Sequence, residues 1–157
     1  MSPTLDRIDR ELLRALQANA RLTVAELAER VNLSPSPCWR RVRQLEEAGY
    51  IEGFSARLSA QRLGYGVTAF VSLMMGSHTQ EMARALELRL TQIPQIVACH
   101  NVSGRYDFLL EVVATDLNAF GEFTRNILQA LPGVQEIHSS FSLKAVKSGY
   151  VLPVADL

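Results

Sequence analysis

Arginine side chains gather in residues 32–45, a stretch that holds three arginines and no acidic residue. Successive residues of an α-helix are about 100° apart, so a helix here would place Arg40 and Arg43 opposite an apolar stripe. Arginine binds phosphate and reads guanine, and glutamine reads adenine. This spacing favours DNA contact over the alternative that the arginines are merely solvated. The residues expected to contact DNA from this helix are Ser34, Ser36, Trp39, Arg40, Arg41, Arg43 and Gln44.

Two other residues of this segment are open to alternative interpretations. Cys38 shares the apolar stripe with Val42 and Leu45, so we expect a small core residue rather than a redox sensor. Trp39 lies on the flank of the helix. Stacking on the protein's own surface and contact with the sugar–phosphate backbone are equally compatible with that position.

The overall charge does not exclude nucleic acid. Lys+Arg and Asp+Glu are equal at 16 each, but the distribution of charge decides binding rather than its sum. A nearly neutral head with roughly two to four cations binds DNA weakly by itself. We therefore expect two heads to act together, about 34 Å apart on successive turns of one DNA face.

Residues 1–58 are expected to form a DNA-binding domain that begins with three helices. Leucine and isoleucine recur at three- and four-residue steps through residues 5–16, which predicts an amphipathic helix. Thr23 stands three residues before Glu26, the capping-box pattern that starts a second helix. Either of the serines before the arginine-rich segment can cap the third helix.

The third helix is expected to end at Gly49, because glycine frequently follows a helix C-terminus. Residues 50–58 have the composition of strands, with Gly53 as a hairpin turn. Short helices joined by a tight turn and followed by a strand pair form the winged helix-turn-helix pattern. In this wing, Arg57 is expected to reach a phosphate.

The pattern changes after residues 59–66, a glycine-containing segment that we expect to be a hinge. Residues 67–147 follow the order βαββαβ, the split ferredoxin-like arrangement, so the predicted fold class is α+β. Residues 148–157 form a C-terminal tail without an informative pattern. The expected elements of this second domain are strands at 67–75, 96–102, 107–114 and 134–146, and helices at 79–93 and 116–131.

Motifs in both halves of the chain are characteristic of one protein family when they occur together. The first half has an L-D-x-x-D opening from Leu5 and an S-P-x-P-C segment from Ser34, and the second has SGRYDFLLEVVATDLNAF over 103–120 and LPGV over 131–134. Together they resemble the Lrp/AsnC family of leucine-responsive, or feast/famine, transcriptional regulators. The resemblance implies a cytoplasmic regulator with a ligand-sensing domain that dimerises through its sheet. Such dimers commonly assemble further, to tetramers or octamers.

The resemblance also implies that a small amino acid binds between neighbouring subunits, with no other cofactor. A glycine turn exposes backbone N–H groups to a carboxylate, and Asp107 can hold an α-ammonium group. The alternative is an ordinary hairpin turn with a hydrogen-bonding aspartate, next to an Arg105 that either binds a carboxylate or faces water. The implied effector residues are Gly104, Arg105, Tyr106, Asp107, Leu117, Ser139, Ser140 and Phe141.

Several other functions are disfavoured. No apolar run approaches the ~20 residues that cross a bilayer, and the polar N-terminus is not typical of a signal peptide. The two cysteines and three histidines have neither a disulfide pattern nor a zinc spacing. Phosphate-loop, nucleophile-elbow and zinc-protease motifs are missing, so we do not expect an enzyme. Two alternatives stay open: a sirohaem decarboxylase-like enzyme on the same fold, and an amino-acid-binding oligomerisation module that does not bind DNA.

Overall fold

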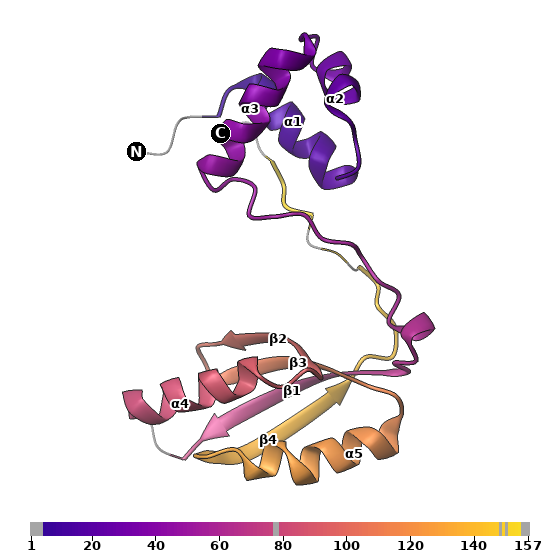
Figure 1. The fold of residues 1–157 in the computed structure, drawn as a ribbon. Coiled ribbons are helices and arrows are strands. Elements are labelled where there is room, and N and C mark those ends of the chain that lie inside the picture. Colours follow the sequence, from indigo (N-terminus) through magenta and orange to yellow (C-terminus); the bar gives the residue numbers. More distant parts are fainter. Residues whose placement is uncertain (1–4, 77–78, 148, 150, 155–157) are drawn as a thin grey trace. The chain divides into compact units, whose positions relative to one another are not determined.

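A computed structural model describes residues 5–76, 79–147, 149 and 151–154 of the chain. The chain divides into two compact units. The first, called the head below, contains the residues up to Arg57 together with those from Lys147 onward. The second, called the sheet unit, is Leu58–Val146. The polypeptide therefore passes between the two units twice (Figure 1).

The helices of the head are α1 (Arg7–Ala18), α2 (Val24–Arg30) and α3 (Pro35–Glu47). The predicted capping box of α2 is confirmed. The Glu26 amide donates to Thr23 Oγ1 at 3.3 Å, and the Thr23 amide donates to Glu26 Oε2 at 2.7 Å. Asp6 and Asp9 form the same reciprocal arrangement at the start of α1. These side chains satisfy N–H groups that have no partner within the helix.

The core of the head is formed by the apolar sides of its three helices. Asn32, with φ 53°, makes the turn between α2 and α3, and Gly49, with φ 76°, ends α3 as predicted. The left-handed backbone at residue 49 favours glycine, because glycine has no Cβ to clash with the following carbonyl. The buried core residues are Leu12, Leu16, Leu27, Ala28, Val31, Cys38 and Leu45.

The prediction of a hairpin at residues 50–58 is wrong. Residues 51–59, all of which the structure describes, contain no strand. Gly53 lacks the positive φ that tight two-residue hairpin turns favour, so the chain does not turn back on itself to form a strand pair here. Within the predicted hinge, Gln61–Leu63 forms one 3₁₀ turn. Arg57 therefore lies on an extended segment and not in a strand pair.

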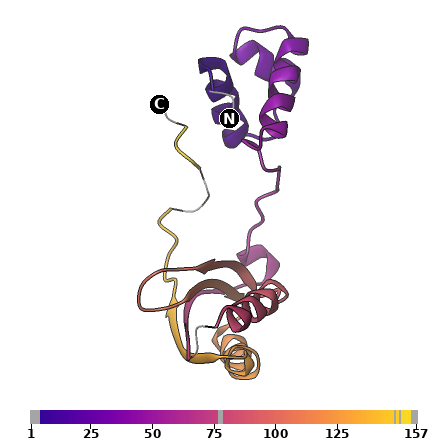
Figure 2. The same cartoon turned by 90° about the vertical axis from the view of Figure 1, so that its left-hand side faces the viewer.

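The elements of the sheet unit are β1 (Val67–Met75), α4 (Gln80–Thr91), β2 (Ile96–Asn101), β3 (Phe108–Ala114), α5 (Leu117–Asn126) and β4 (Val134–Phe141). The strands form one antiparallel sheet in the order β2-β3-β1-β4, which confirms the predicted ferredoxin-like α+β arrangement. Both helices cover the same face of the sheet (Figures 1 and 2). None of the helices in the described part of the chain is long and apolar enough to cross a membrane.

The alternation of side chains along β1 gives the sheet a covered face and an open face. Val71 and Leu73 are fully buried against the helices, whereas Phe70 between them is 42% exposed. Residues paired across neighbouring strands lie on the same face. The register of the sheet therefore assigns each strand residue to one face or the other.

Two elements end well before the predicted residue. The last strand ends at Phe141 rather than at 146; Phe141 pairs with Ala69, near the start of its partner β1 at Val67. The Ser142 amide still donates to the Thr68 carbonyl, at 2.9 Å, as the last contact of this pair of strands. The predicted helix at 116–131 stops at Asn126 and is followed by a separate 3₁₀ turn.

Candidate nucleic-acid and effector sites

The outer face of α3 carries the residues predicted to contact DNA. Arg40, Arg43 and Gln44 are exposed, whereas Cys38 and Leu45 on the opposite side are buried in the head. The amphipathic division predicted for this helix is confirmed. The cationic side chains thus project from a rigid helix whose apolar side is fixed by packing.

The start of α3 is also exposed. Ser34 occupies the N-cap position with an extended backbone, but its side chain makes no capping hydrogen bond within the described head. Pro35 follows in the first turn, where its missing N–H costs nothing. The hydroxyls of Ser34 and Ser36 are therefore at the exposed beginning of the helix.

Trp39 and Arg43 contact each other on this surface. The Arg43 guanidinium carbon lies 5.6 Å from the centroid of the indole, a cation–π geometry, and Trp39 is 53% exposed. Arg43 Nη2 also lies 3.5 Å from Glu47 Oε1, a partner that the sequence analysis did not consider. Exposed ion pairs of this type contribute little free energy, so a phosphate can replace the carboxylate.

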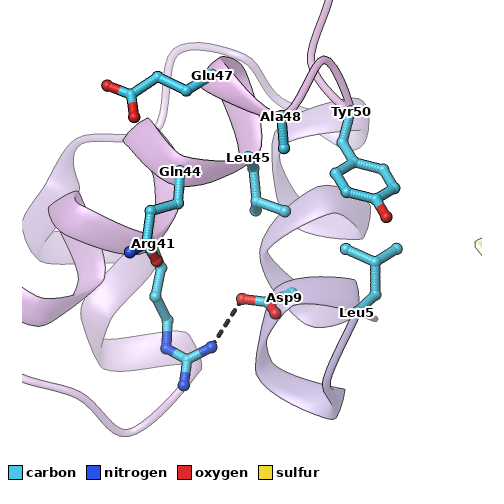
Figure 3. A pocket seen from close by; sticks show the side chains of 8 residues that line it. All are labelled: Leu5, Asp9, Arg41, Gln44, Leu45, Glu47, Ala48 and Tyr50. Carbon is cyan, nitrogen blue, oxygen red and sulfur yellow. Dashed lines mark hydrogen bonds and ion pairs between the residues drawn. The ribbon is translucent and has the colours of Figure 1, made fainter. Parts of the chain in front are cut away.

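Arg41 differs from its neighbours, because it joins α3 to α1. Its Nη1 atom donates to Asp6 Oδ2 at 2.7 Å and to Asp9 Oδ1 at 2.8 Å. Figure 3 shows this side chain reaching Asp9 along a groove between the two helices. The hydrogen bonds that Arg41 donates to Asp9 and Asp6 raise the pKa of its guanidinium. Arg41 was predicted to contact DNA, but its charge is already paired within the head.

Arg57 was predicted to reach a phosphate from a strand pair, but residues 51–59 contain no strand. Its guanidinium lies instead beside Gly149. A Cβ atom built onto that glycine would be 3.4 Å from Arg57 Nη1. The extended segment after α3 and the C-terminal segment are therefore neighbours at this point of the head.

The predicted effector turn is anchored to the end of β1. Asp107 Oδ2 accepts a hydrogen bond from the Met75 amide at 2.7 Å, and the Asp107 amide donates to the Leu73 carbonyl at 2.9 Å. Gly104 has φ 125°, so the turn requires glycine there. This geometry matches the alternative of a hydrogen-bonding hairpin aspartate, and one carboxylate oxygen of Asp107 is already engaged.

Arg105 and Tyr106 form a cluster with two residues of β4 that the sequence analysis did not assign to the site. Arg105 Nη2 lies 3.1 Å from Glu136 Oε1, and the Tyr106 hydroxyl lies 3.4 Å from the same oxygen. The Arg105 guanidinium also lies over the Tyr106 ring, which stacks on His138 at a centroid distance of 6.1 Å. Arg105 thus has an anionic partner, although 71% of its side chain is exposed.

The remaining predicted effector residues lie on different faces of the sheet. Ser139 pairs with the buried Val71, whereas Ser140 pairs with Phe70 of the open face. Phe141 is on the covered side, where its ring meets Phe120 of α5 edge-on at 5.1 Å. The remaining residue of the set, at the first position of α5, is the exposed Leu117.

Within one described subunit, these residues therefore do not enclose a single cavity. The glycine turn and the Glu136 cluster belong to one set, and Leu117 and Phe141 belong to another on the covered side. The Glu136 contact was not predictable from local motifs, because it joins residues that are 31 positions apart. Only the strand register brings them together.

Comparison with known families matches both units. Residues 5–52 match the family model described as winged helix-turn-helix DNA-binding, and residues 68–152 match the Lrp/AsnC ligand binding domain. Among curated proteins, the Bkd operon transcriptional regulator of Pseudomonas aeruginosa is 43% identical over 142 residues, covering 90% of this chain and 93% of that protein. The DNA-binding transcriptional activator DecR of Escherichia coli is 35% identical over 150 residues, covering 96% and 99%.

Solved structures show the same similarity. A transcriptional regulator of Neisseria meningitidis in complex with L-methionine has a TM-score of 0.92 and 39% identity, covering 96% of this chain and 97% of that one. A feast or famine regulatory protein of M. tuberculosis, also complexed with L-methionine, has a TM-score of 0.87 and 31% identity, covering 95% and 99%.

Proposed function

Because the chain belongs to the Lrp/AsnC family of transcriptional regulators, we propose that it regulates promoters as a homo-oligomer that responds to an amino acid. The family places DNA binding in the helix-turn-helix of the head and ligand binding in the sheet unit. The observation that carries the proposal is the outer face of α3, where exposed cations lie opposite a buried stripe. Binding to the chromosome implies action in the cytoplasm.

The proposed DNA contacts come from α3. Arg40 and Arg43 bind phosphates or guanine, and Gln44 reads a base edge. Trp39 supports Arg43 by its cation–π contact, and the serine hydroxyls at the start of the helix bind phosphate oxygens. We do not include Arg41, because its guanidinium is paired with two carboxylates of the head.

A second copy of the chain is the proposed partner of the open face of the sheet. Phe70 is exposed at 42% on this face, and Met74 and Leu109 are only half-buried there. Pairing two heads supplies the number of phosphate contacts that a single nearly neutral head lacks. Dimers then meet in tetramers or octamers through further surfaces.

An α-amino acid is the proposed effector, bound where subunits meet. The support is that two similar regulators were solved with L-methionine, and that the effector residues here are divided between the two faces of the sheet. A site completed by a neighbouring subunit accounts for this division. The glycine turn offers N–H groups to the carboxylate, and the carboxylates of Asp107 and Glu136 offer negative charge to the ammonium group.

The test of DNA binding is a double substitution, Arg40→Ala with Arg43→Ala. Binding to the DNA upstream of the chain's own gene should fall roughly ten- to a hundredfold at physiological salt. The matched control is Arg62→Ala with Arg84→Ala, which removes two exposed arginines outside the head. Unchanged affinity of the first variant, or equal losses in both, would refute the assignment of α3.

The test of the effector is a thermal-shift screen of the twenty amino acids at millimolar concentration. A ligand that binds the folded state raises the melting temperature. The screen is repeated with Ser140→Ala and Leu117→Ala, which alter the two separate parts of the proposed site. A hit that neither variant weakens would place the effector elsewhere.

A further inference from the structure

The C-terminal segment at residues 151–154 packs on α1, although its sequence has no recognisable pattern. The Leu152 amide donates to Gln17 Oε1 at 2.7 Å, and Gln17 Nε2 donates to the Leu152 carbonyl at 2.9 Å. One side-chain amide thus pairs with both backbone groups of one residue, as a neighbouring strand would.

A second contact holds the same segment one helical turn earlier on α1. Arg14 Nη2 donates to the Val154 carbonyl at 2.6 Å. Arg14 and Gln17 are three residues apart and so lie on one side of the helix, away from the buried Leu12 and Leu16. Because both contacts are made to backbone atoms, docking depends on an extended segment, and Pro153 between them favours that conformation.

We propose that residues 151–154 act as a strap that fastens the head of their own chain, and that this strap couples effector binding to DNA binding. The chain enters the head once through Arg57 and again through Lys147, so the strap is a second covalent connection to the sheet unit. It departs from β4, the strand that carries the proposed effector residues Ser140 and Phe141.

The coupling has a simple physical form. A ligand shifts a two-state equilibrium only by its different affinities for the two states. The strap supplies two states, docked on α1 or released, and its hydrogen bonds to Gln17 and Arg14 lie at a partly exposed surface where release costs little. An effector that displaces the end of β4 changes the length of chain available for docking. The coupling rests on the proposed function, whereas the docking does not.

Docking is tested by hydrogen–deuterium exchange on the full-length protein. The Leu152 amide should be protected in the wild type and should exchange at the rate of an unfolded peptide in Gln17→Ala. Alanine keeps α1 helical while it removes both hydrogen bonds to the strap. The control is Gln129→Ala, an exposed glutamine in the sheet unit, which should leave Leu152 protected. A wild-type Leu152 amide that exchanges freely would overturn the proposal.

The origin of the strap is tested by cross-linking. Ala18→Cys, next to Gln17 at the exposed end of α1, is combined with Leu152→Cys in a Cys99→Ser background and treated with a short bismaleimide. Both hydrogen bonds of Gln17 to the Leu152 backbone stay in place, and Cys38 is buried and does not compete. A cross-linked product of single-chain size supports docking within one chain. A product of dimer size would overturn it and would indicate that neighbouring copies exchange their straps.

Coupling is tested by DNA affinity with and without L-methionine at millimolar concentration, for the wild type, Gln17→Ala and a chain that ends at Gly149. In both strap variants, the ratio of the DNA affinity with L-methionine to the DNA affinity without it should be about one. The rise in melting temperature that L-methionine causes should persist. Strap variants that keep the wild-type ratio would overturn the coupling. A wild type whose affinity ignores L-methionine and every other amino acid would refute effector control itself, whatever the exchange experiment shows.

Discussion

Two arginines on α3, two positions apart, have opposite surroundings in the head. Arg41 donates to two carboxylates of α1 at 2.7 and 2.8 Å, whereas Arg43 has one exposed partner at 3.5 Å. Arg41→Met should therefore destabilise the head by about 1 kcal/mol, because it leaves the partly buried carboxylate of Asp9 and the exposed one of Asp6 without their cation. Arg43→Met should cost less than about 0.5 kcal/mol.

The two variants should rank in the opposite order when DNA affinity is measured instead of stability. Arg43→Met should weaken binding, and Arg41→Met should leave most of it. Trp39 is the only tryptophan of the chain, so its fluorescence during urea unfolding reports on the head alone. If Arg41→Met lost more DNA affinity than Arg43→Met while the head remained folded, our exclusion of Arg41 from the interface would be wrong.

The carboxylate of Asp6 makes the stability of the head sensitive to acid. The Asp9 backbone amide, together with Arg41, holds the pKa of Asp6 below its ordinary value. A carboxyl group with a depressed pKa stabilises the fold at pH values above its unfolded pKa, and this contribution is lost as the pH falls through the folded pKa. The Trp39-detected melting temperature should thus fall more steeply in acid for the wild type than for Asp6→Asn. Equal slopes would mean that this hydrogen-bonded ion pair contributes nothing.

At the scale of elements, one glycine fixes the point at which β1 enters the sheet. Gly66 donates its amide to the Thr115 carbonyl at 3.2 Å, and a Cβ at Gly66 would lie 2.7 Å from that oxygen. Because the obstacle is backbone, Gly66→Ala should destabilise the sheet unit by about 1–3 kcal/mol. The measurement is urea unfolding followed by circular dichroism.

Gly53 supplies the matched control for that substitution. It has no positive φ, and a Cβ there would meet no described atom within 4 Å. Gly53→Ala should be neutral, or stabilising by up to about 1 kcal/mol, because it reduces the freedom of the unfolded chain. A loss in Gly53→Ala as large as that in Gly66→Ala would show that close backbone approach is not the cause.

The elements that could be predicted are those whose signals are local. Thr23 with Glu26 forms the capping box of α2, Gly49 ends α3, and Asp116 caps α5 through the Ala119 amide. The hairpin prediction failed because strand formation requires a partner, which composition alone does not reveal. The last strand was overestimated for the same reason.

The candidate sites were predictable only in part. The amphipathic division of α3 follows from helical periodicity alone. The partners of Arg41 and Arg105, in contrast, are more than thirty positions away, and tertiary packing decides them. Motif resemblance gave Ser139 and Ser140 the same role, although the alternation of β4 turns them to opposite faces.

At the scale of the whole molecule, DNA binding should depend on how many heads act together. Each head offers two cations from α3, Arg40 and Arg43. Two heads then neutralise about four phosphates, and the logarithm of the binding constant should fall with the logarithm of salt concentration with a slope of about −4. A monomer should show about half that slope.

Phe70→Glu separates these two cases. The residue is 42% exposed in one subunit, so the substitution should disturb the fold little, but it places a second carboxylate beside Glu111 on the open face. Two such faces cannot then pair without burying unpaired charge, so light scattering should detect monomers. Their DNA binding should be weaker and the salt slope should fall to about −2. A folded monomer that kept the full slope would show that the cations of a single head suffice, and a variant that remained dimeric would show that the subunits associate through another surface.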